Sequence, residues 1–185
     1  MQVSELKAGL IDALIIREGG YSNRKNDRGG ATRYGITEAT ARRHGYEGDM
    51  ANLPYDLAVD IYASEFWQSL KLDSIGDISQ PLAVQLFDFG VNSAPKNAAT
   101  QLQLLLNVLN DEQRLYADLT VDGILGSKTI AALTAYQRAR GNDGMTILTE
   151  ALRALRISFC VDIAINDASQ EENIFGWLSR IVHLN

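Results

Sequence analysis

The chain has 185 residues, a formal net charge of −6 and a single cysteine, Cys160. This length is enough for one large domain or two small ones with a sizeable core. The negative charge gives no electrostatic reason to bind nucleic acid or an anionic membrane surface, and a lone cysteine excludes an internal disulfide. A polymer of largely uncharged sugars stays compatible with this composition, because hydrogen bonds and stacking hold such a ligand.

The first predicted element is a helix that ends before a glycine pair. Leu6, Leu10 and Leu14 recur at four-residue spacing, and Gly19-Gly20 stops the pattern. Acidic residues within this stretch do not fit a signal peptide. Its most apolar part, Leu10–Ile16, is too short to span a bilayer. We therefore expect no stable insertion into a membrane.

The rest of the chain also reads as helical. Capping residues, prolines and glycines predict helices over Glu38–His44 after the Thr37 cap, after Pro54, over Leu82–Phe89, after Pro95, from the Ser127 cap to Gly141, over Met145–Asn166 and over Asn173–Val182. Only residues 31–36 and 120–124 could be extended. These patterns predict a mainly α fold with one small β-hairpin. A boundary near Gly90 would separate residues 1–90 from residues 91–185, although both parts could share one compact unit.

Glu18 is an unusual residue for its position. It occupies the last turn of the first predicted helix, where backbone carbonyls present partial negative charge. Such a place favours the protonated carboxyl, most of all if Ile15, Ile16 and Tyr21 remove it from water. A general acid needs this property. The alternative is an ordinary solvated glutamate.

Asp27 lies nine positions after Glu18 and directly precedes a segment with two glycines. Gly29 and Gly30 allow a tight reversal that would bring Asp27 back towards the helix end. Thr32 and Tyr34 would then lie on one side of a short extended segment. Two carboxylates across a small gap are the groups that cleave glycosidic bonds. The alternative is that Asp27 only caps the turn.

The segment from residue 18 to residue 37, EGGYSNRKNDRGGATRYGIT, resembles the motif of the glycoside hydrolase family 108 muramidases found in phages and prophages. Shared features are Glu-Gly-Gly-Tyr at 18–21, Asp-x-Gly-Gly-x-Thr at 27–32 and Gly-Ile-Thr at 35–37. Arg24-Lys25 stands where members commonly have Asp-Pro, so this sequence has no residue that could take the role of that aspartate.

The C-terminal half resembles the peptidoglycan-binding region that follows the catalytic part in this family. The similar segments are FDFGVNSAPKNAATQLQLLLN, which contains the marker Asn92, and VDGILGSKTIAAL. GWLSRI near the end resembles the closing motif of the family, with Ser179 where Asn is common. The Asp122-Gly123 turn reads as a structural feature and not as a glycan site.

The resemblance implies a lysozyme-like helical fold that hydrolyses the β-1,4 bond between N-acetylmuramic acid and N-acetylglucosamine. Glu18 would be the catalytic acid. By analogy with other phage lysozymes, Asp27 would stabilise an oxocarbenium-like transition state and Thr32 would position the attacking water. We expect substrate contacts from Tyr21, Tyr34, Asn92 and Trp67, although an aromatic residue at the helical spacing of Trp67 is more often a core residue than a sugar platform.

The resulting functional hypothesis is a phage endolysin that lyses its bacterial host and needs no cofactor or metal. His44 and His183 stand apart from any ligand pattern. The enzyme would accumulate as a monomer in the bacterial cytoplasm and would reach the wall through holin lesions. Two alternatives are a lytic transglycosylase and a non-catalytic wall-binding component of a virion or secretion system.

Overall fold

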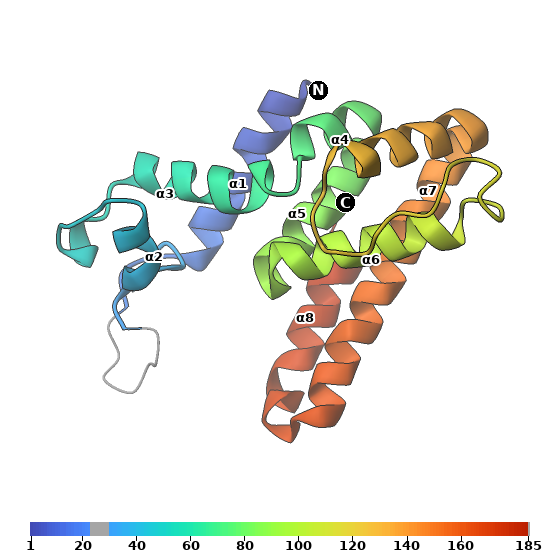
Figure 1. The fold of residues 1–185 in the computed structure, drawn as a ribbon. Helices are drawn as coiled ribbons and strands as arrows, with labels where there is room; N and C mark the ends of the chain where they lie inside the picture. The colour runs from blue at the N-terminus through green and yellow to red at the C-terminus, as the bar shows by residue number, and fades with distance from the viewer. Residues whose placement is uncertain (23–29, 185) are drawn as a thin grey trace. The chain divides into compact units, whose positions relative to one another are not determined.

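The computed structural model describes residues 1–22 and 30–184 (Figure 1). The chain divides into two compact units, Met1–Gln68 and Ser69–Asn185, and each is considered by itself. Helices dominate both units, and the described residues form a single two-stranded sheet. The predicted mainly α fold with one small hairpin is therefore confirmed. The assignment of functions to residues 1–90 and 91–185 stays a prediction.

The first unit begins with α1, Val3–Glu18, which is drawn in blue in Figure 1. The Glu5 carboxylate accepts a hydrogen bond from the backbone N–H of Gln2 at 3.0 Å and so supports the helix start. Gly19 has a φ of 76° and ends the helix as predicted. The buried face consists of Leu6, Ile11, Leu14 and Ile15. Leu10 is only half-buried, because the face follows the 3.6-residue period more closely than a strict four-residue step.

A hairpin follows the part of the chain outside the described residues. Its strands are β1, Thr32–Arg33, and β2, Ile36–Thr37, and they pair antiparallel with Thr32 opposite Thr37. The two turn residues, Tyr34 and Gly35, have φ values of 55° and 76°. Positive φ at both central residues matches the twist of paired strands.

Thr37 then caps α2, Glu38–Arg43, because its hydroxyl accepts from the backbone N–H of Thr40 at 3.3 Å. After the short 3-10 helix η1, Met50–Asn52, Pro54 precedes α3, Tyr55–Tyr62. This start was predicted. The helix continues directly into a π-helical segment, η2, Ala63–Gln68, which no sequence pattern indicated.

The second unit is a bundle of helices around an apolar core. Its elements are α4 Leu72–Ile78, α5 Gln80–Ser93, α6 Pro95–Val108, α7 Ser127–Asn166, η3 Ala168–Gln170 and α8 Glu171–His183. Helix α5 packs against α4, α6 and α7, and α8 packs against α7. Ser79 caps α5 by accepting from the N–H of Leu82, and Pro95 opens α6, so both predicted starts are confirmed.

Two predictions for this unit need correction. Ser127 is the first residue of α7 and makes no capping bond, since Gly126 occupies the cap position. Residues 120–124 are not extended, because the Asp122 carboxylate accepts from the N–H of Ile124 at 2.9 Å and closes a turn. The break at Gly141 is confirmed by its φ of 60° within α7. Among the described residues, no helix is long and apolar enough to cross a membrane.

Candidate active site

Glu18 lies at the carboxyl end of α1, beside the turn of the hairpin. A Cβ atom added to Gly35 would stand 3.0 Å from the Cγ of Glu18 and 2.7 Å from the hydroxyl of Tyr62. The Tyr62 hydroxyl donates a hydrogen bond to the backbone carbonyl of Tyr34 at 2.8 Å. The hairpin turn, α3 and the end of α1 therefore meet at the side chain of Glu18.

The charge of Glu18 acts on the neighbouring Tyr62. Burial raises the pKa of Tyr62 to about 12, and the Glu18 carboxylate adds to the increase. Tyr62 consequently keeps its proton at every pH in the ordinary range and remains a donor to Tyr34. The hydrogen bond from Tyr62 holds Tyr34 in place. It thereby holds the hairpin turn that brings Gly35 close to Glu18.

Only one of the three apolar residues that could remove Glu18 from water is buried. Ile15 is buried, but Ile16 is 77% exposed and Tyr21 is 46% exposed. Successive helical residues point about 100° apart, so a helix that buries Ile15 turns Ile16 towards solvent. Glu18 itself is exposed. Asp27 lies outside the described residues.

Thr32 is held in the hairpin by its backbone and its side chain. Its N–H donates to the carbonyl of Ser22 at 2.8 Å, and the Ser22 N–H donates to the Thr32 carbonyl at 2.9 Å. The Thr32 hydroxyl donates to the same Ser22 carbonyl at 3.4 Å. These bonds join the segment after α1 to β1. The water-positioning role of Thr32 stays a prediction.

Tyr34 belongs to a surface cluster with Arg33, Tyr55 and Asp12, and the sequence indicated only Tyr34 as a candidate site residue. Its ring meets Tyr55 edge-to-face, with centroids 5.8 Å apart, and the Arg33 guanidinium carbon lies 4.9 Å from its centroid. The Tyr55 hydroxyl donates to the carboxylate of Asp12 at 2.6 Å, and this hydrogen bond raises the pKa of Tyr55. Tyr55 was missed, although its place directly after the helix-opening Pro54 was visible in the sequence.

Comparison with known proteins identifies both halves of the chain. Residues 11–94 match the glycosyl hydrolase 108 family, and residues 97–182 match a predicted peptidoglycan domain. The chain thus combines a region that matches the glycosyl hydrolase 108 family with a region that matches a peptidoglycan domain, in this order. This hydrolase is therefore of the lysozyme type, a muramidase-type enzyme that acts on peptidoglycan. The first match contains Glu18 and the hairpin, and the second contains most of α6, α7 and α8.

A solved structure has the same fold. The hydrolase is similar to Brucella abortus SagA, with 23% sequence identity and a TM-score of 0.66. The similarity covers 98% of this chain and 96% of that one. The predicted mainly α, lysozyme-like fold is thereby confirmed. A comparison with curated proteins gives no match.

The structure argues against a sugar-stacking role for Trp67 in the hydrolase. Trp67 is 0% exposed, so its ring has no free face for a sugar. Phe66 instead lies beside Tyr62, with ring centroids 5.7 Å apart. The alternative weighed from the sequence, that Trp67 is a core residue, fits this burial.

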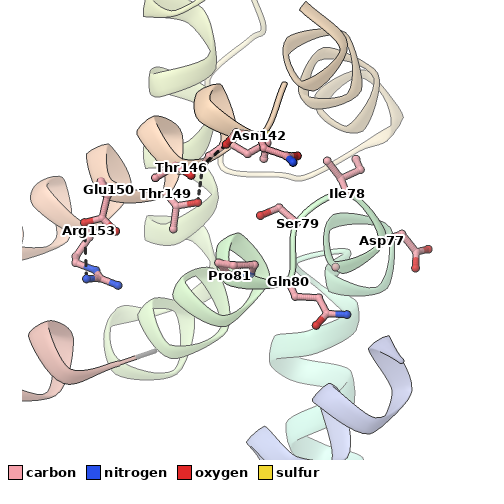
Figure 2. Close-up of a pocket in the computed structure, with 12 residues that line it drawn as sticks. Asp77, Ile78, Ser79, Gln80, Pro81, Asn142, Thr146, Thr149, Glu150 and Arg153 are labelled. Carbon is pink, nitrogen blue, oxygen red and sulfur yellow. Dashed lines mark hydrogen bonds and ion pairs between the residues drawn. The ribbon is translucent and has the colours of Figure 1, made fainter. Parts of the chain in front are cut away.

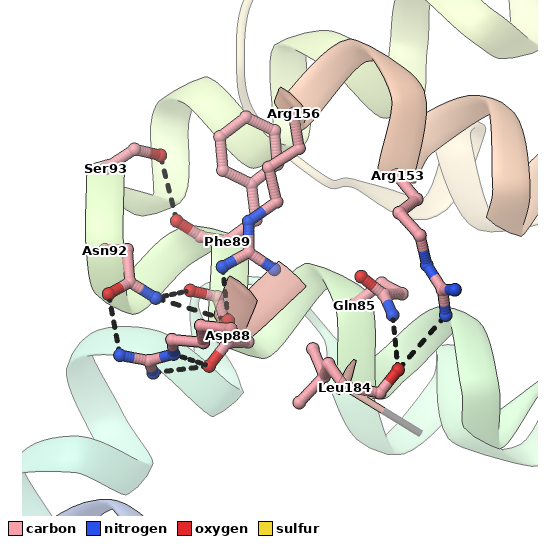
Figure 3. A network of polar contacts seen from close by, with 9 residues as sticks. Gln85, Asp88, Phe89, Asn92, Ser93, Arg153, Arg156 and Leu184 are labelled. Carbon is pink, nitrogen blue, oxygen red and sulfur yellow. Dashed lines mark hydrogen bonds and ion pairs between the residues drawn. The ribbon is translucent and has the colours of Figure 1, made fainter. Parts of the chain in front are cut away.

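Asn92 lies in the second unit and takes part in a polar network (Figure 3). Its amide donates to the carbonyl and the carboxylate of Asp88, and its carbonyl oxygen accepts from Arg180 at 2.9 Å. Both ends of the amide are therefore engaged within the protein. Direct contact between Asn92 and glycan stays a prediction.

A pocket of about 740 Å³ lies between the α4–α5 junction and α7 (Figure 2). Ser79, Gln80, Asn142 and Thr146 contribute hydroxyl and amide groups to its lining. Sugars bind through such groups, so this pocket is a second candidate contact surface for peptidoglycan in the hydrolase.

The described residues contain no group of three or more metal-ligating side chains. His44 instead lies 2.9 Å from the carboxylate of Glu65, which ties α2 to η2.

Proposed function

We propose that the chain is a phage-type endolysin, an N-acetylmuramidase that hydrolyses the bond between N-acetylmuramic acid and N-acetylglucosamine. One observation carries this proposal: the side chain of Glu18 stands at an exposed helix end, packed beside Gly35 and Tyr62. An exposed carboxyl group whose stem is held on rigid elements can meet a glycosidic oxygen in a defined orientation.

In this mechanism, Glu18 donates its proton to the oxygen of the leaving sugar. The Asp27 carboxylate stabilises the positive charge that develops at the anomeric carbon, and Thr32 positions the attacking water. A carboxylate separation of about 5 Å would give retention, and about 6.5–9.5 Å would give inversion. Tyr21 and Tyr34 would contact the sugars on either side of the cleaved bond.

The first experiment is a digestion of purified peptidoglycan, with the glycan ends identified by mass spectrometry. The unmodified chain should release reducing N-acetylmuramic acid ends, and Glu18→Gln should release none. Glu5→Gln, an exposed glutamate in the first turn of the same helix, is the matched control and should keep full activity.

Two other outcomes would overturn the proposal. Anhydro sugar ends would make the protein a lytic transglycosylase and would remove the water from the mechanism. Binding without cleavage by the unmodified chain would leave a wall-binding component of a virion or secretion system.

The endolysin role adds a cellular prediction. The enzyme would accumulate as a monomer in the bacterial cytoplasm and would need no cofactor, and a holin would open its path to the wall. Cells that express the chain should therefore grow until the membrane is permeabilised and should lyse promptly afterwards. Lysis at the same rate with an intact membrane would contradict the holin dependence.

A further inference from the structure

A pair of tyrosines continues the candidate active site away from Glu18, and the muramidase mechanism assigns no role to one of them. Gly35 lies against the side chain of Glu18, and Tyr34 precedes it in the hairpin turn. The ring of Tyr34 meets the ring of Tyr55 edge-to-face, with centroids 5.8 Å apart. A continuous series of neighbours therefore leads from the candidate acid to Tyr55.

Tyr34 has a backbone conformation that a tyrosine rarely adopts. Its φ is 55°, at a turn position that asparagine or glycine takes more easily. The hydroxyl of Tyr62 donates to its backbone carbonyl at 2.8 Å, and Nη2 of Arg33 donates to its hydroxyl at 3.2 Å. Residues held in such conformations cluster at functional sites. The turn therefore keeps a tyrosine ring where a smaller residue would fold more easily.

Tyr55 combines exposure with a fixed position. It is the first residue of α3 and is 39% exposed. Its hydroxyl donates to the carboxylate of Asp12 on α1 at 2.6 Å, and its ring meets Tyr34 in the hairpin turn. Contacts with two other elements thus hold the ring. A side chain that is already ordered loses little conformational freedom on binding, so Tyr55 can contact a ligand at low entropic cost.

A sugar suits this surface. The C–H groups of a pyranose ring are apolar and slightly positive, whereas the face of an aromatic ring is slightly negative. Asp12 stands six positions before Glu18 on α1, which is about 9 Å along the helix axis. The ring that Asp12 holds is also one neighbour further from Glu18 than the ring of Tyr34. A strand that extends from Glu18 past Tyr34 therefore reaches Tyr55 with a sugar outside the cleaved pair.

We propose that Tyr55 contacts a sugar of the glycan strand next to the pair joined by the cleaved bond. Tyr55 is then a substrate-binding residue, and Asp12 is a positioning residue that holds its ring. The contact favours long strands, since only a strand that extends beyond the cleaved pair can occupy it. The place of this sugar relative to the cleaved bond rests on the proposed function, because that function makes Glu18 the catalytic acid.

Two variants of Tyr55 separate its ring from its hydroxyl. Tyr55→Phe and Tyr55→Leu both lose the hydrogen bond to Asp12, but only Tyr55→Leu loses the aromatic face. On peptide-free glycan strands, Tyr55→Leu should raise KM about threefold to tenfold at unchanged kcat, as expected for loss of one ring contact. Tyr55→Phe should recover most of this loss. Equal KM values for the two variants would overturn the proposal.

Asp12→Ala tests the positioning role. It removes the same hydrogen bond as Tyr55→Phe, so the two variants should have the same KM. Asp12→Ala should have no further effect on KM in a chain that also carries Tyr55→Leu, because no ring remains to be held. An added effect in that double variant would show that Asp12 does not act through Tyr55.

Substrate length and a second tyrosine locate the contact. With the shortest oligosaccharide that the unmodified chain cleaves, Tyr55→Leu should have the KM of the unmodified chain. Tyr46→Leu is the matched control on long strands and should leave KM unchanged. Tyr46 also has a bonded hydroxyl and an arginine near its ring, but it is not in the series from Glu18 to Tyr55. An equal rise in KM for short and long substrates would overturn the location.

The test remains separate from that of the proposed function. Cleavage is followed by the shortening of the strands, so it is counted whether the new ends are reducing or anhydro. A chain that cleaves no strand would contradict the proposed function, and calorimetric titration with the same strands would then decide about Tyr55. Weaker binding by Tyr55→Leu than by Tyr55→Phe would support the contact, and equal binding would overturn it.

Discussion

Gly35 combines two requirements that exclude a side chain. Its φ of 76° lies in the left-handed region, and an added Cβ would stand 2.7 Å from the Tyr62 hydroxyl and 3.0 Å from the Cγ of Glu18. The backbone conformation alone disfavours other residues. The contact also involves the candidate catalytic acid, because any side chain at position 35 must displace Glu18 or Tyr62.

Gly35→Ala should therefore lower both stability and activity. We expect a loss of about 1–2 kcal/mol from backbone strain and a further loss of about 1–3 kcal/mol from overpacking. Muramidase activity should fall more than about tenfold, since a displacement near 1 Å can be that costly. Thermal unfolding and wall digestion measure the two effects.

Gly45→Ala is the control for this prediction. Gly45 has a φ of 81° but no atom within 4 Å of an added Cβ, so it tests strain without contact. Equal activity losses in the two variants would contradict a specific contact with Glu18.

Tyr62 should make the protein less stable at alkaline pH. The pKa of a tyrosine is about 10 in an unfolded chain, and that of Tyr62 is raised to about 12 in the fold. Between these values the unfolded state releases the proton while the folded state keeps it, so stability falls as pH rises. Tyr116, whose pKa is also raised to about 12, adds to this loss.

Unfolding temperatures measured from pH 9 to pH 12 test this expectation. Stability should depend most steeply on pH between about pH 10 and pH 12. The decline should be shallower in Tyr62→Phe and in Tyr116→Phe, and activity at neutral pH should fall only in the first. A decline of unchanged slope in Tyr62→Phe would contradict the assignment.

At the scale of elements, Asp88 joins three helices of the second unit. Its carboxylate, on α5, accepts from Arg156 on α7 and from Arg180 on α8. Gln85 and Arg153 both donate to the carbonyl of Leu184, which also holds the segment after α8 (Figure 3). Buried polar bonds, and not apolar packing alone, therefore fix α8 in place.

Asp88→Ala should destabilise the protein by about 3–5 kcal/mol, because two buried or partly buried cations would lose their counter-charge. Denaturant unfolding measures the effect. Glu38→Ala, which removes a solvent-exposed pair with Arg42, should cost less than about 1 kcal/mol. Similar losses in the two variants would show that burial of the Asp88 network carries little energetic weight.

Sequence patterns predicted those elements whose limits are set by local chemistry. Gly19, Thr37, Pro54 and Pro95 mark the ends of α1, α2, α3 and α6 through backbone and capping preferences. Helix α4 has only seven residues, too few for a clear period, and it was missed. The π-helical η2 was also missed, because it has no local signal.

In the candidate site too, the sequence predicted what local chemistry determines and missed what depends on distant contacts. Glu18 was found from its place at a helix end, which is a local property. Its contact with Gly35 and the hydrogen bond from Tyr62 to Tyr34 join residues 17 and 28 positions apart in the sequence. Single-sequence patterns carry no information about such contacts, and for the same reason they did not show that Trp67 is buried.

At the scale of the whole molecule, the net charge of −6 should oppose approach to the anionic polymers of intact walls. Raising the salt concentration shortens the range of this repulsion, from about 30 Å at 0.01 M to about 8 Å at 0.15 M. Clearing of whole walls should therefore accelerate with moderate salt. Cleavage of isolated uncharged glycan strands is the control and should respond little, and a flat response on intact walls would contradict the idea.

Helix α1 has a consequence for how such an enzyme could adapt to temperature. Ile15, in the core, and Glu18, the candidate acid, lie within one turn of the same helix. Packed interiors transmit small displacements, so a mutation that repacks Ile15 also moves the Glu18 side chain. Selection for heat resistance and selection for turnover therefore act on the same few residues, and a lineage cannot change one property at this end of α1 without altering the other.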